Sequence, residues 1–374
     1  MLPASSFLVA LSLLGAPQAP PIVPAPPLVD LAPLLEPIRE QHRVPALGAV
    51  VIVDGAVHAL GVSGIRRAGD DAKVTADDLW HLGSCTKAMT ATLLARFVER
   101  GKLAWTTPMA DALPDLAAGM HEASRSITVQ HLLMHRAGLP GGPPADLWRR
   151  LWNWPGPPQN ARTEVATAML HAAPARPPGE RFLYSNAGYI VAGAIAERLG
   201  ETTWEELIRR EVWTPLGITT GGFGAPGRKD SVDQPWGHQS GKAGLEPKFT
   251  DNPPALGPAG TVHMTLRDWA KFAALHLGLP GLDGKPLLAA ATLTALHTPP
   301  PGADYALGWN VTKRSWAPGP VLTHTGSNTL WFCVAWLAPE AKFAVLVTCN
   351  QGEGSAATDA VAAACVQRFA GKHR

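Results

Sequence analysis

Residues 84–98 read SCTKAMTATLLARFV, and this stretch decides how the rest of the chain is interpreted. It combines a Ser-x-x-Lys spacing with a run of good helix formers, and Gly101 suits the end of the helix that they predict. Three residues are nearly one helical turn, so the spacing brings the Lys87 amine under the Ser84 hydroxyl. The helix N-terminus adds a positive field that favours a developing oxyanion. The pair is a candidate nucleophile and base, although a lone match also fits a Ser N-cap and a solvated Lys.

Two further motifs follow at a distance. Tyr184-Ser185-Asn186 precedes a predicted helix, and a tyrosine hydroxyl in a loop can carry a proton while an asparagine amide can bind a substrate amide. His324-Thr325-Gly326 lies on an apolar run of strand length. Glycine there allows close approach of a ligand, and a strand edge suits a peptide-like molecule. Taken singly, each motif also fits a packed side chain with a satisfied hydrogen bond.

In this order, the three motifs resemble the active-site motifs of the family that holds class C β-lactamases, DD-carboxypeptidases, D-aminopeptidases and related esterases. The surrounding segments are similar to that family as well, at residues 126–140, 178–199, 257–272 and 305–310. The resemblance covers the chain from about Leu28 to the C-terminal helix.

The resemblance implies roles for the residues of the first two motifs. Ser84 would be the nucleophile, and Lys87 and Tyr184 would share the general-base and general-acid work. Asn186 would hold the acyl side of the substrate. Which of Lys87 and Tyr184 takes the serine proton stays open at this stage.

The third motif would supply the opposite wall of the site. By the same resemblance, His324 would help the proton relay and anchor a substrate carboxylate, with Thr325, Gly326 and Ser327 lining the same edge. The backbone N–H groups of Ser84 and Ser327 would form the oxyanion hole.

His324 departs from the class C β-lactamases, which carry lysine at this position, and resembles the DD-carboxypeptidases. A histidine side chain loses its charge near neutral pH whereas a lysine keeps it. We therefore expect binding of an anionic substrate to weaken between about pH 6 and 8. Cys85, beside the nucleophile, is expected to pack beneath the site.

The function expected on these grounds is a serine hydrolase that acts through a Ser84 acyl-enzyme on amide or ester substrates, DD-peptidase-like or β-lactamase-related. A carboxylesterase of the same family and a penicillin-binding or sensing module without turnover are the alternatives. An α/β-hydrolase is excluded because the chain has no G-x-S-x-G string. No cofactor is expected.

Two other groups of side chains admit two interpretations each. His131 and His135 are four residues apart and could hold a metal. The chain has no H-E-x-x-H string and no clear third ligand, so packing of these histidines in a helix is preferred, and we expect no metal. Trp148, Trp152 and Trp154 could wall a substrate cleft or simply pack.

The predicted fold is α+β and β-lactamase/transpeptidase-like, with one antiparallel sheet built from both termini, flanked by helices, and a mostly helical inserted domain. Asp54-Gly55 predicts a two-residue hairpin turn. The predicted helices are residues 29–42 and 356–369, and the predicted strands are residues 47–53, 56–62, 322–324, 330–337 and 343–348. The expected domain is residues 28–374, divided into a sheet part at 28–83 and 300–374 and a helical region at 84–299.

The composition limits the partners. The chain is 46% hydrophobic and 17% charged with a net charge of +2, and its basic residues are scattered, so a nucleic-acid partner is not expected. A small-molecule or peptide substrate fits better, and a monomer is favoured. Cys85, Cys333, Cys349 and Cys365 lack the spacing of a zinc site. Cys333 and Cys349 fall on neighbouring predicted strands, so a disulfide and buried free thiols are both open.

Residues 1–27 are expected to be a signal-like segment followed by a proline-rich linker. The apolar run at 7–14 resembles a secretory signal and is too short to span a bilayer. Against export, no Lys or Arg precedes Arg39, and Pro17 and Pro20 follow the apolar run closely. A periplasmic or secreted location is predicted, with a cytoplasmic one as the alternative.

Overall fold

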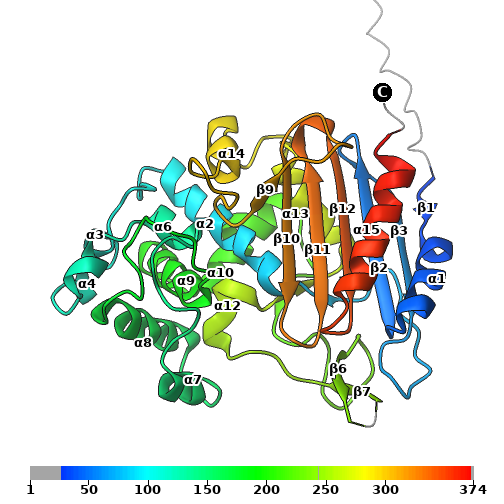
Figure 1. Ribbon diagram of the computed structural model, residues 1–374, viewed down its shortest axis with the longest axis horizontal. Helices are drawn as coiled ribbons and strands as arrows, with labels where there is room; N and C mark the ends of the chain where they lie inside the picture. The colour runs from blue at the N-terminus through cyan, green and yellow to red at the C-terminus, as the bar shows by residue number, and fades with distance from the viewer. Residues whose placement is uncertain (1–26, 243, 372–374) are drawn as a thin grey trace, which may run out of the picture.

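The computed structural model describes residues 27–242 and 244–371, and in this part of the chain the largest sheet has seven strands in the order β1-β3-β2-β12-β11-β10-β9 (Figure 1). Both ends of the chain contribute to it, as predicted. Its strands are β1 (Val29–Asp30), β2 (Ala46–Val53), β3 (Ala56–Gly64), β9 (Asn310–Thr312), β10 (Val321–Ser327), β11 (Phe332–Ala338) and β12 (Phe343–Cys349).

The hairpin between β2 and β3 is the strongest local prediction, and it is confirmed. Asp54 and Gly55 both have positive φ, 49° and 84°, which a two-residue turn of this kind requires. All residues of β2 and β12 are buried, because these strands lie in the middle of a sheet that is covered on both faces.

The first strand corrects two expectations. β1 pairs in parallel with β3, so the sheet is mixed and not wholly antiparallel. The first helix, α1 (Ala32–His42), begins three residues later than predicted, because Val29 and Asp30 pair with β3. The Asp30 carboxylate then accepts a hydrogen bond from the Ala32 N–H at 2.9 Å and starts the helix there.

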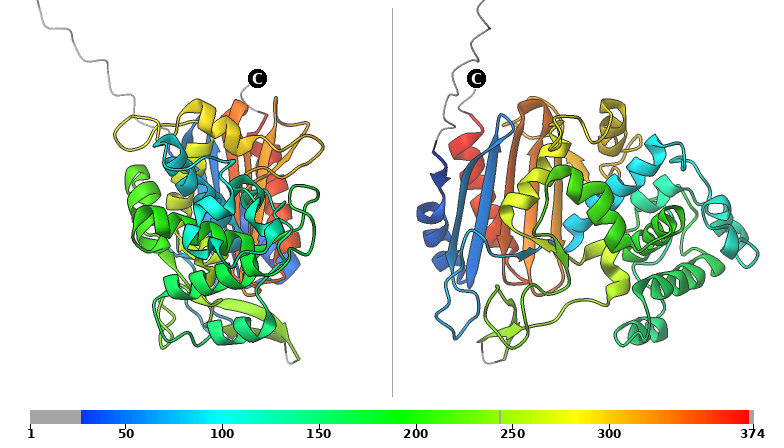
Figure 2. Two further views of the ribbon diagram at one scale, coloured as in Figure 1. Left: turned by 90° about the vertical axis from the view of Figure 1, so that its left-hand side faces the viewer. Right: turned by 180° about the vertical axis from the view of Figure 1, so that it is seen from behind.

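Helices cover both faces of the sheet (Figure 2). α1 and α15 (Ser355–Phe369) pack on one face, and the helical region packs on the other. Cys333 pairs with Thr348 and Cys349 pairs with Phe332, so the two cysteines are not opposite each other in the sheet. Their side chains lie on opposite faces of the sheet, in two different hydrophobic cores. The possible disulfide between them is wrong for this reason, and all four cysteines are buried free thiols.

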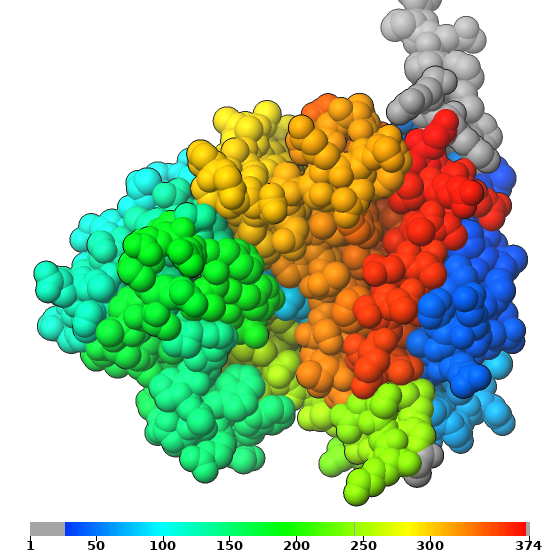
Figure 3. Space-filling view, viewed as in Figure 1, coloured from blue at the N-terminus to red at the C-terminus, as the bar shows by residue number. Residues whose placement is uncertain are grey.

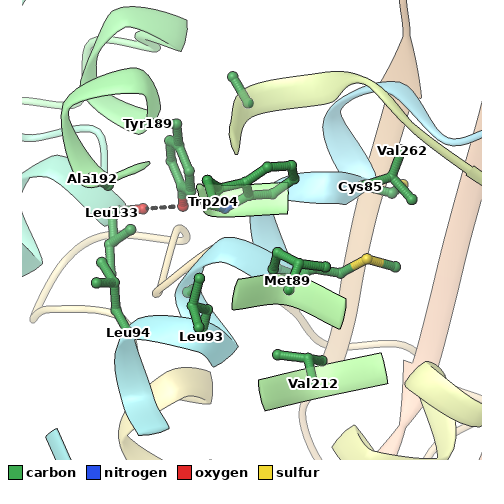
Figure 4. Close-up of a cluster of buried hydrophobic side chains, with 14 of the residues drawn as sticks. Cys85, Met89, Leu93, Leu94, Leu133, Tyr189, Ala192, Trp204, Val212 and Val262 are labelled. Atoms are coloured by element: carbon green, nitrogen blue, oxygen red, sulfur yellow. Dashed lines mark hydrogen bonds between the residues drawn. The ribbon is translucent and has the colours of Figure 1, made fainter. Parts of the chain in front are cut away.

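The helical region surrounds two long central helices, α2 and α9. Figure 4 shows the apolar core between them, where Met89 and Leu93 of α2 lie near Trp204 and the Tyr189 hydroxyl donates to the Leu133 carbonyl. The helices are α2 (Thr86–Glu99), α3 (Met109–Ala112), α4 (Pro114–Ala117), α5 (Glu122–Arg125), α6 (Val129–Leu133), α7 (Ala145–Leu151), α8 (Pro158–His171), α9 (Asn186–Gly200), α10 (Trp204–Ile208), α11 (Thr214–Leu216), α12 (Gly257–Gly260), α13 (Leu266–His276) and α14 (Ala290–His297).

Short strands in and beside the helical region were not predicted. Three of them form a small sheet in the order β4-β8-β5, and two form a hairpin. They are β4 (Trp80–His81), β5 (Gly222–Phe223), β6 (Gly237–Gly241), β7 (Gly244–Lys248) and β8 (Val262–Met264). Each is too short or too polar to show the alternation that marks a strand.

Among the described residues, no helix has both the length and the apolar character needed to cross a bilayer. The signal-like segment at 7–14 lies outside the described residues, so a periplasmic or secreted location stays a prediction. Figure 3 shows a hollow where the green helical lobe meets the orange strands of the sheet, and the candidate site is built from elements on both sides of it.

Candidate active site

Ser84 lies where the chain turns from the short strand β4 into α2. The turn is a single 3-10 segment, η1 (Gly83–Cys85). Gly83 has a φ of 46°, and a Cβ atom at this position would lie 2.4 Å from the backbone N of Ser327. Both the positive φ and the close approach require glycine. The turn therefore holds the partly exposed Ser84 directly beside β10.

Lys87 is completely buried one helical turn below Ser84. Its Nζ atom lies within hydrogen-bonding distance of three oxygens: Ser84 Oγ (3.0 Å), Asn186 Oδ1 (2.8 Å) and the Ala259 carbonyl (2.7 Å). Burial lowers the pKa of Lys87 to about 7, with Cys85 acting in the opposite direction. In the neutral form, the amine can donate its two protons to Asn186 and Ala259 and present its lone pair to Ser84.

Tyr184 approaches Ser84 from the loop before α9. Its hydroxyl donates to Ser84 Oγ at 2.7 Å, and its ring lies over Lys87 Nζ at 4.8 Å from the centroid. The residue is 37% exposed, yet desolvation by the surrounding protein raises the pKa of Tyr184 to about 12, against the hydrogen bond to Ser84, which lowers it. At pH 7 only about one phenol in 10⁵ is ionised at such a pKa. Tyr184 is thus a proton donor to Ser84.

His324 occupies a buried position behind the exposed edge of β10. Its Nδ1 atom lies 2.6 Å from the Thr325 carbonyl and its Nε2 atom 2.9 Å from the Tyr305 hydroxyl. Because a carbonyl only accepts, Nδ1 carries a proton, and in the neutral ring Nε2 accepts from Tyr305. The hydrogen bonds of the described residues therefore link His324 to Tyr305 and not directly to Ser84 or Lys87.

The edge of β10 beside the nucleophile is open. Within the described residues β9 pairs only with positions 321–323 of β10, so the stretch that carries Thr325 and Ser327 has no strand next to it on that side. Both of these residues are exposed, whereas Gly326 is buried. A Cβ atom at Gly326 would lie 2.0 Å from a carbonyl oxygen of the segment before Ser84. An extended ligand can pair with this edge without displacing a protein strand.

All three tyrosines of the chain gather around His135. Its ring centroid lies 4.3 Å from Tyr184, 4.8 Å from Tyr305 and 5.2 Å from Tyr189. Burial holds the pKa of His135 well below its usual range, and any charge on Lys87 or His324 acts in the same direction, so the ring is neutral, and its Nδ1 accepts from the Ser185 N–H. Tyr189, Tyr305 and His135 were not predicted as site residues. Two signals were available, the scarcity of tyrosine and the family-like segments at 126–140, 178–199 and 305–310, which contain these residues.

The comparison with known proteins decides the family. The beta-lactamase family model matches residues 31–368 of this chain. The chain belongs to the beta-lactamase family. This confirms the resemblance found in the three motifs, and the mixed sheet flanked by helices confirms the expected beta-lactamase/transpeptidase-like fold.

Individual relatives agree with the family. Penicillin-binding protein 4 of Amycolatopsis lactamdurans is 28% identical over 328 residues, covering 84% of this chain and 83% of that protein. Unguisins hydrolase ungD' of Aspergillus campestris (strain IBT 28561) is 27% identical over 342 residues, covering 86% of this chain and 61% of that protein, so the chain spans less than two thirds of that relative. The octameric penicillin-binding protein homologue from Pyrococcus abyssi superposes with a TM-score of 0.72 at 23% identity, covering 90% and 76% of the two chains.

In this beta-lactamase-family chain, the paired histidines do not share one helical face. His131 accepts from the Thr128 N–H as part of the cap of α6, whereas His135 lies past the end of that helix with a φ of 55°. The helical i, i+4 face is therefore broken between them. Among the described residues no group of three or more His, Cys, Asp or Glu side chains could hold a metal ion.

Two of the three tryptophans and Cys85 pack inside the fold, and a role of the tryptophans as the wall of a substrate cleft stays a prediction. Trp148 and Trp154 pack against the helical core, and Trp152 is exposed and meets Trp148 edge to face. Cys85 is buried under the nucleophile, with its Sγ atom 3.5 Å from that of Cys333.

Proposed function

We propose that this chain is a serine hydrolase that is acylated at Ser84 by an amide or ester substrate and then deacylated by water. One observation carries the proposal. Ser84 Oγ lies between Lys87 Nζ at 3.0 Å and the Tyr184 hydroxyl at 2.7 Å. Lys87 can be neutral and accept a proton near neutral pH, whereas Tyr184 is protonated there and donates to Ser84. This asymmetry favours Lys87 as the base and Tyr184 as the acid.

Acylation follows from this arrangement. Neutral Lys87 takes the Ser84 proton as Oγ bonds to the substrate carbonyl carbon. The backbone N–H groups of Ser84 and Ser327 stabilise the resulting oxyanion, and each such donor contributes about 3 kcal/mol in comparable sites. The bond to the leaving nitrogen or oxygen then breaks. The proton held on Lys87 reaches the leaving group through the Tyr184 hydroxyl.

Deacylation repeats these steps with water as the nucleophile. Water gives a proton to the Lys87 and Tyr184 pair and attacks the acyl carbon, and Ser84 Oγ leaves and regains its proton. One water is consumed for each bond that is cleaved, and the enzyme returns to its starting state. No cofactor is needed for this balance.

The walls of the site favour a peptide-like substrate. The open edge of β10 offers backbone groups and the exposed hydroxyls of Thr325 and Ser327. Because Asn186 Oδ1 faces Lys87, its Nδ2 group serves as the donor to the acyl-side carbonyl. These features and the relatives named as penicillin-binding support a DD-peptidase-like or β-lactamase-related activity.

His324 acts in this proposal through its neighbours. It holds Tyr305 on one side and the Thr325 carbonyl on the other, so it fixes the β10 edge and the tyrosine cluster behind the site. Its part in the proton relay and in anchoring a carboxylate would be indirect, because both ring nitrogens are engaged.

The test compares the wild type with Ser84→Ala on a chromogenic cephalosporin, a short-chain p-nitrophenyl ester and a D-Ala-D-Ala peptide. We expect Ser84→Ala to lose activity on every substrate that the wild type turns over. Ser355→Ala, an exposed serine at the start of α15, is the matched control and should keep full activity. Activity that survives in Ser84→Ala would contradict the proposal.

The same proteins distinguish an enzyme from a sensor without turnover. Mass spectrometry after mixing with penicillin should show an adduct on the peptide that contains Ser84, followed by its loss and by repeated release of product. An adduct that forms once and persists on every substrate would identify a penicillin-binding or sensing module. The substrate with the highest turnover rate, peptide, cephalosporin or ester, would indicate whether the enzyme is a peptidase, a β-lactamase or a carboxylesterase.

A further inference from the structure

A buried His–Asp pair lies directly behind the nucleophile and takes no part in the proton transfers described above. His81, the last residue of β4, is fully buried, and its Nε2 atom lies 2.7 Å from Asp251 Oδ2. The Asp251 side chain is 5% exposed. Trp331 stacks on the His81 ring with centroids 5.3 Å apart. Burying a carboxylate and an imidazole costs free energy unless each of their polar atoms forms a hydrogen bond, so the hydrogen-bond partners of this pair indicate its role.

The hydrogen bonds fix the form of the imidazole. The Gly83 N–H donates to His81 Nδ1 at 3.1 Å, so Nδ1 presents a lone pair. The proton therefore sits on Nε2, which donates to the Asp251 carboxylate. Both ring nitrogens are used in this way, and Ser84 Oγ is held by other groups. His81 is thus not a second base for the nucleophile.

The second carboxylate oxygen reaches the other wall of the site. Asp251 Oδ1 accepts from Asn328 Nδ2 at 2.8 Å and from the Asn252 N–H at 2.7 Å. Asn328 Oδ1 in turn accepts from the backbone N–H groups of the two residues at 330 and 331, each at 3.1 Å. Asn328 directly follows Ser327 and is 6% exposed. One carboxylate therefore holds the segment before Ser84 and the segment after Ser327.

We propose that His81, Asp251 and Asn328 form a positioning strut that fixes the backbone amides of Ser84 and Ser327 as an oxyanion hole. The inference rests on the proposed function, since it concerns the same acylation step. The left-handed Gly83 lies against Ser327 with no room for a Cβ atom, so a small rotation of this turn would move one amide relative to the other. Errors of about 1 Å in such a site cost on the order of 10²-fold in rate.

The decisive pair of variants is His81→Phe and His81→Asn. Phenylalanine keeps a ring against Trp331 but removes the acceptor for the Gly83 N–H. Asparagine places its Oδ1 near the position of Nδ1 and so keeps that acceptor. We expect His81→Phe to lower the single-turnover acylation rate on a p-nitrophenyl ester about 10²-fold with KM within about 3-fold of the wild type. His81→Asn should recover most of that loss.

Asp251→Asn tests the strut from its other end. N–H donors of Asn252 and Asn328 face Oδ1, so the amide oxygen will turn toward them and the amide NH₂ group toward His81. His81 must then carry its proton on Nδ1, which opposes the Gly83 N–H. We expect a loss of about 10-fold or more in acylation rate. The affinity for phenylboronic acid, whose tetrahedral serine adduct occupies the oxyanion hole, should fall in parallel with the rate.

His276→Phe is the matched control, because His276 is equally buried but lies on α13 and bonds to His297. It should leave the acylation rate unchanged. His81→Phe acylating within 3-fold of the wild type, or His81→Asn acylating no faster than His81→Phe, would overturn the strut. If His81→Phe does not fold, Asp251→Asn is the deciding variant. An acylation rate and an affinity for phenylboronic acid equal to those of the wild type would then overturn the strut. A wild type that forms no Ser84 adduct would instead refute the proposed function.

Discussion

The two sides of Ser84 are built in different ways. On the side of the helical region, its hydroxyl meets Lys87 and Tyr184, whose pKa values are moved in opposite directions by burial, to about 7 and about 12. On the side of the sheet, its backbone is held by the Gly83 turn, which lies against Ser327 and whose N–H donates to His81 Nδ1. Proton transfer and oxyanion stabilisation are thus supplied by separate parts of the fold. Changes on the first side should alter the pH dependence of the reaction, and changes on the second should alter its rate alone.

The largest effect is expected from Lys87→Met, which removes the proton acceptor from the hydroxyl side. A positioned base typically contributes 10²–10⁴-fold, and we expect a loss on the order of 10³-fold in the acylation rate. Lys102→Met, at an exposed position just after α2, is the matched control. Acylation by Lys87→Met at a tenth of the wild-type rate or faster would show that another group takes the serine proton.

Tyr184→Phe should follow, with a loss of about 10²-fold on a peptide amide. The ring and its contact with Lys87 remain, so the change isolates the hydroxyl. A nitrophenolate leaves without needing a proton, so the loss on a p-nitrophenyl ester should be clearly smaller than on the amide. Steady-state kinetics on both substrates measure the ratio. Equal losses on both would mean that Tyr184 does not protonate the leaving group.

A smaller effect is expected on stability. Above about pH 7 folded Lys87 releases its proton, whereas in the unfolded chain it keeps the proton up to about pH 10.5. The unfolded state therefore binds more protons in this window, and the free energy of unfolding rises with pH. Relative to Lys87→Met, the wild type should gain roughly 2 kcal/mol between pH 7 and 9, measured by urea unfolding. Parallel stability curves for the two proteins would contradict a depressed pKa.

Much of the fold follows from local rules in the sequence. Asp54-Gly55 specifies the hairpin because both positions need positive φ, and the C-terminal helix, α15, was placed within one residue of its observed start. β1 was missed because a two-residue strand has no periodicity, and its parallel pairing depends on where α1 docks. β6 and β7 were missed because Gly, Ser and charged residues dominate them.

The motifs predicted which side chains would lie together at the candidate site. The structure brings together Ser84, Lys87, Tyr184 and Asn186, the residues of the first two motifs. The carbonyl of Ala259 could not be predicted, since a backbone oxygen leaves no mark on residue type.

His81 and Asp251 were missed for a different reason. Their pairing spans 170 residues of sequence, and each alone is an unremarkable polar residue. Only the fold brings the strand before the nucleophile and the loop before α12 together. We also expect anionic substrates to bind more weakly as the pH rises from about 6 to 8, because His324 then loses its charge. This stays a prediction, and the pH dependence of KM tests it.

The most direct test is the pH dependence of the single-turnover acylation rate, measured as the Ser84 adduct of a p-nitrophenyl ester by mass spectrometry. We expect the rate to rise with pH through a midpoint near 7, where buried Lys87 loses its proton, and then to reach a plateau. His81→Phe should keep this midpoint at a lower rate, and Lys87→Met should lack the rise. A midpoint above pH 9 in the wild type, or the same rise in Lys87→Met, would contradict neutral Lys87 as the base.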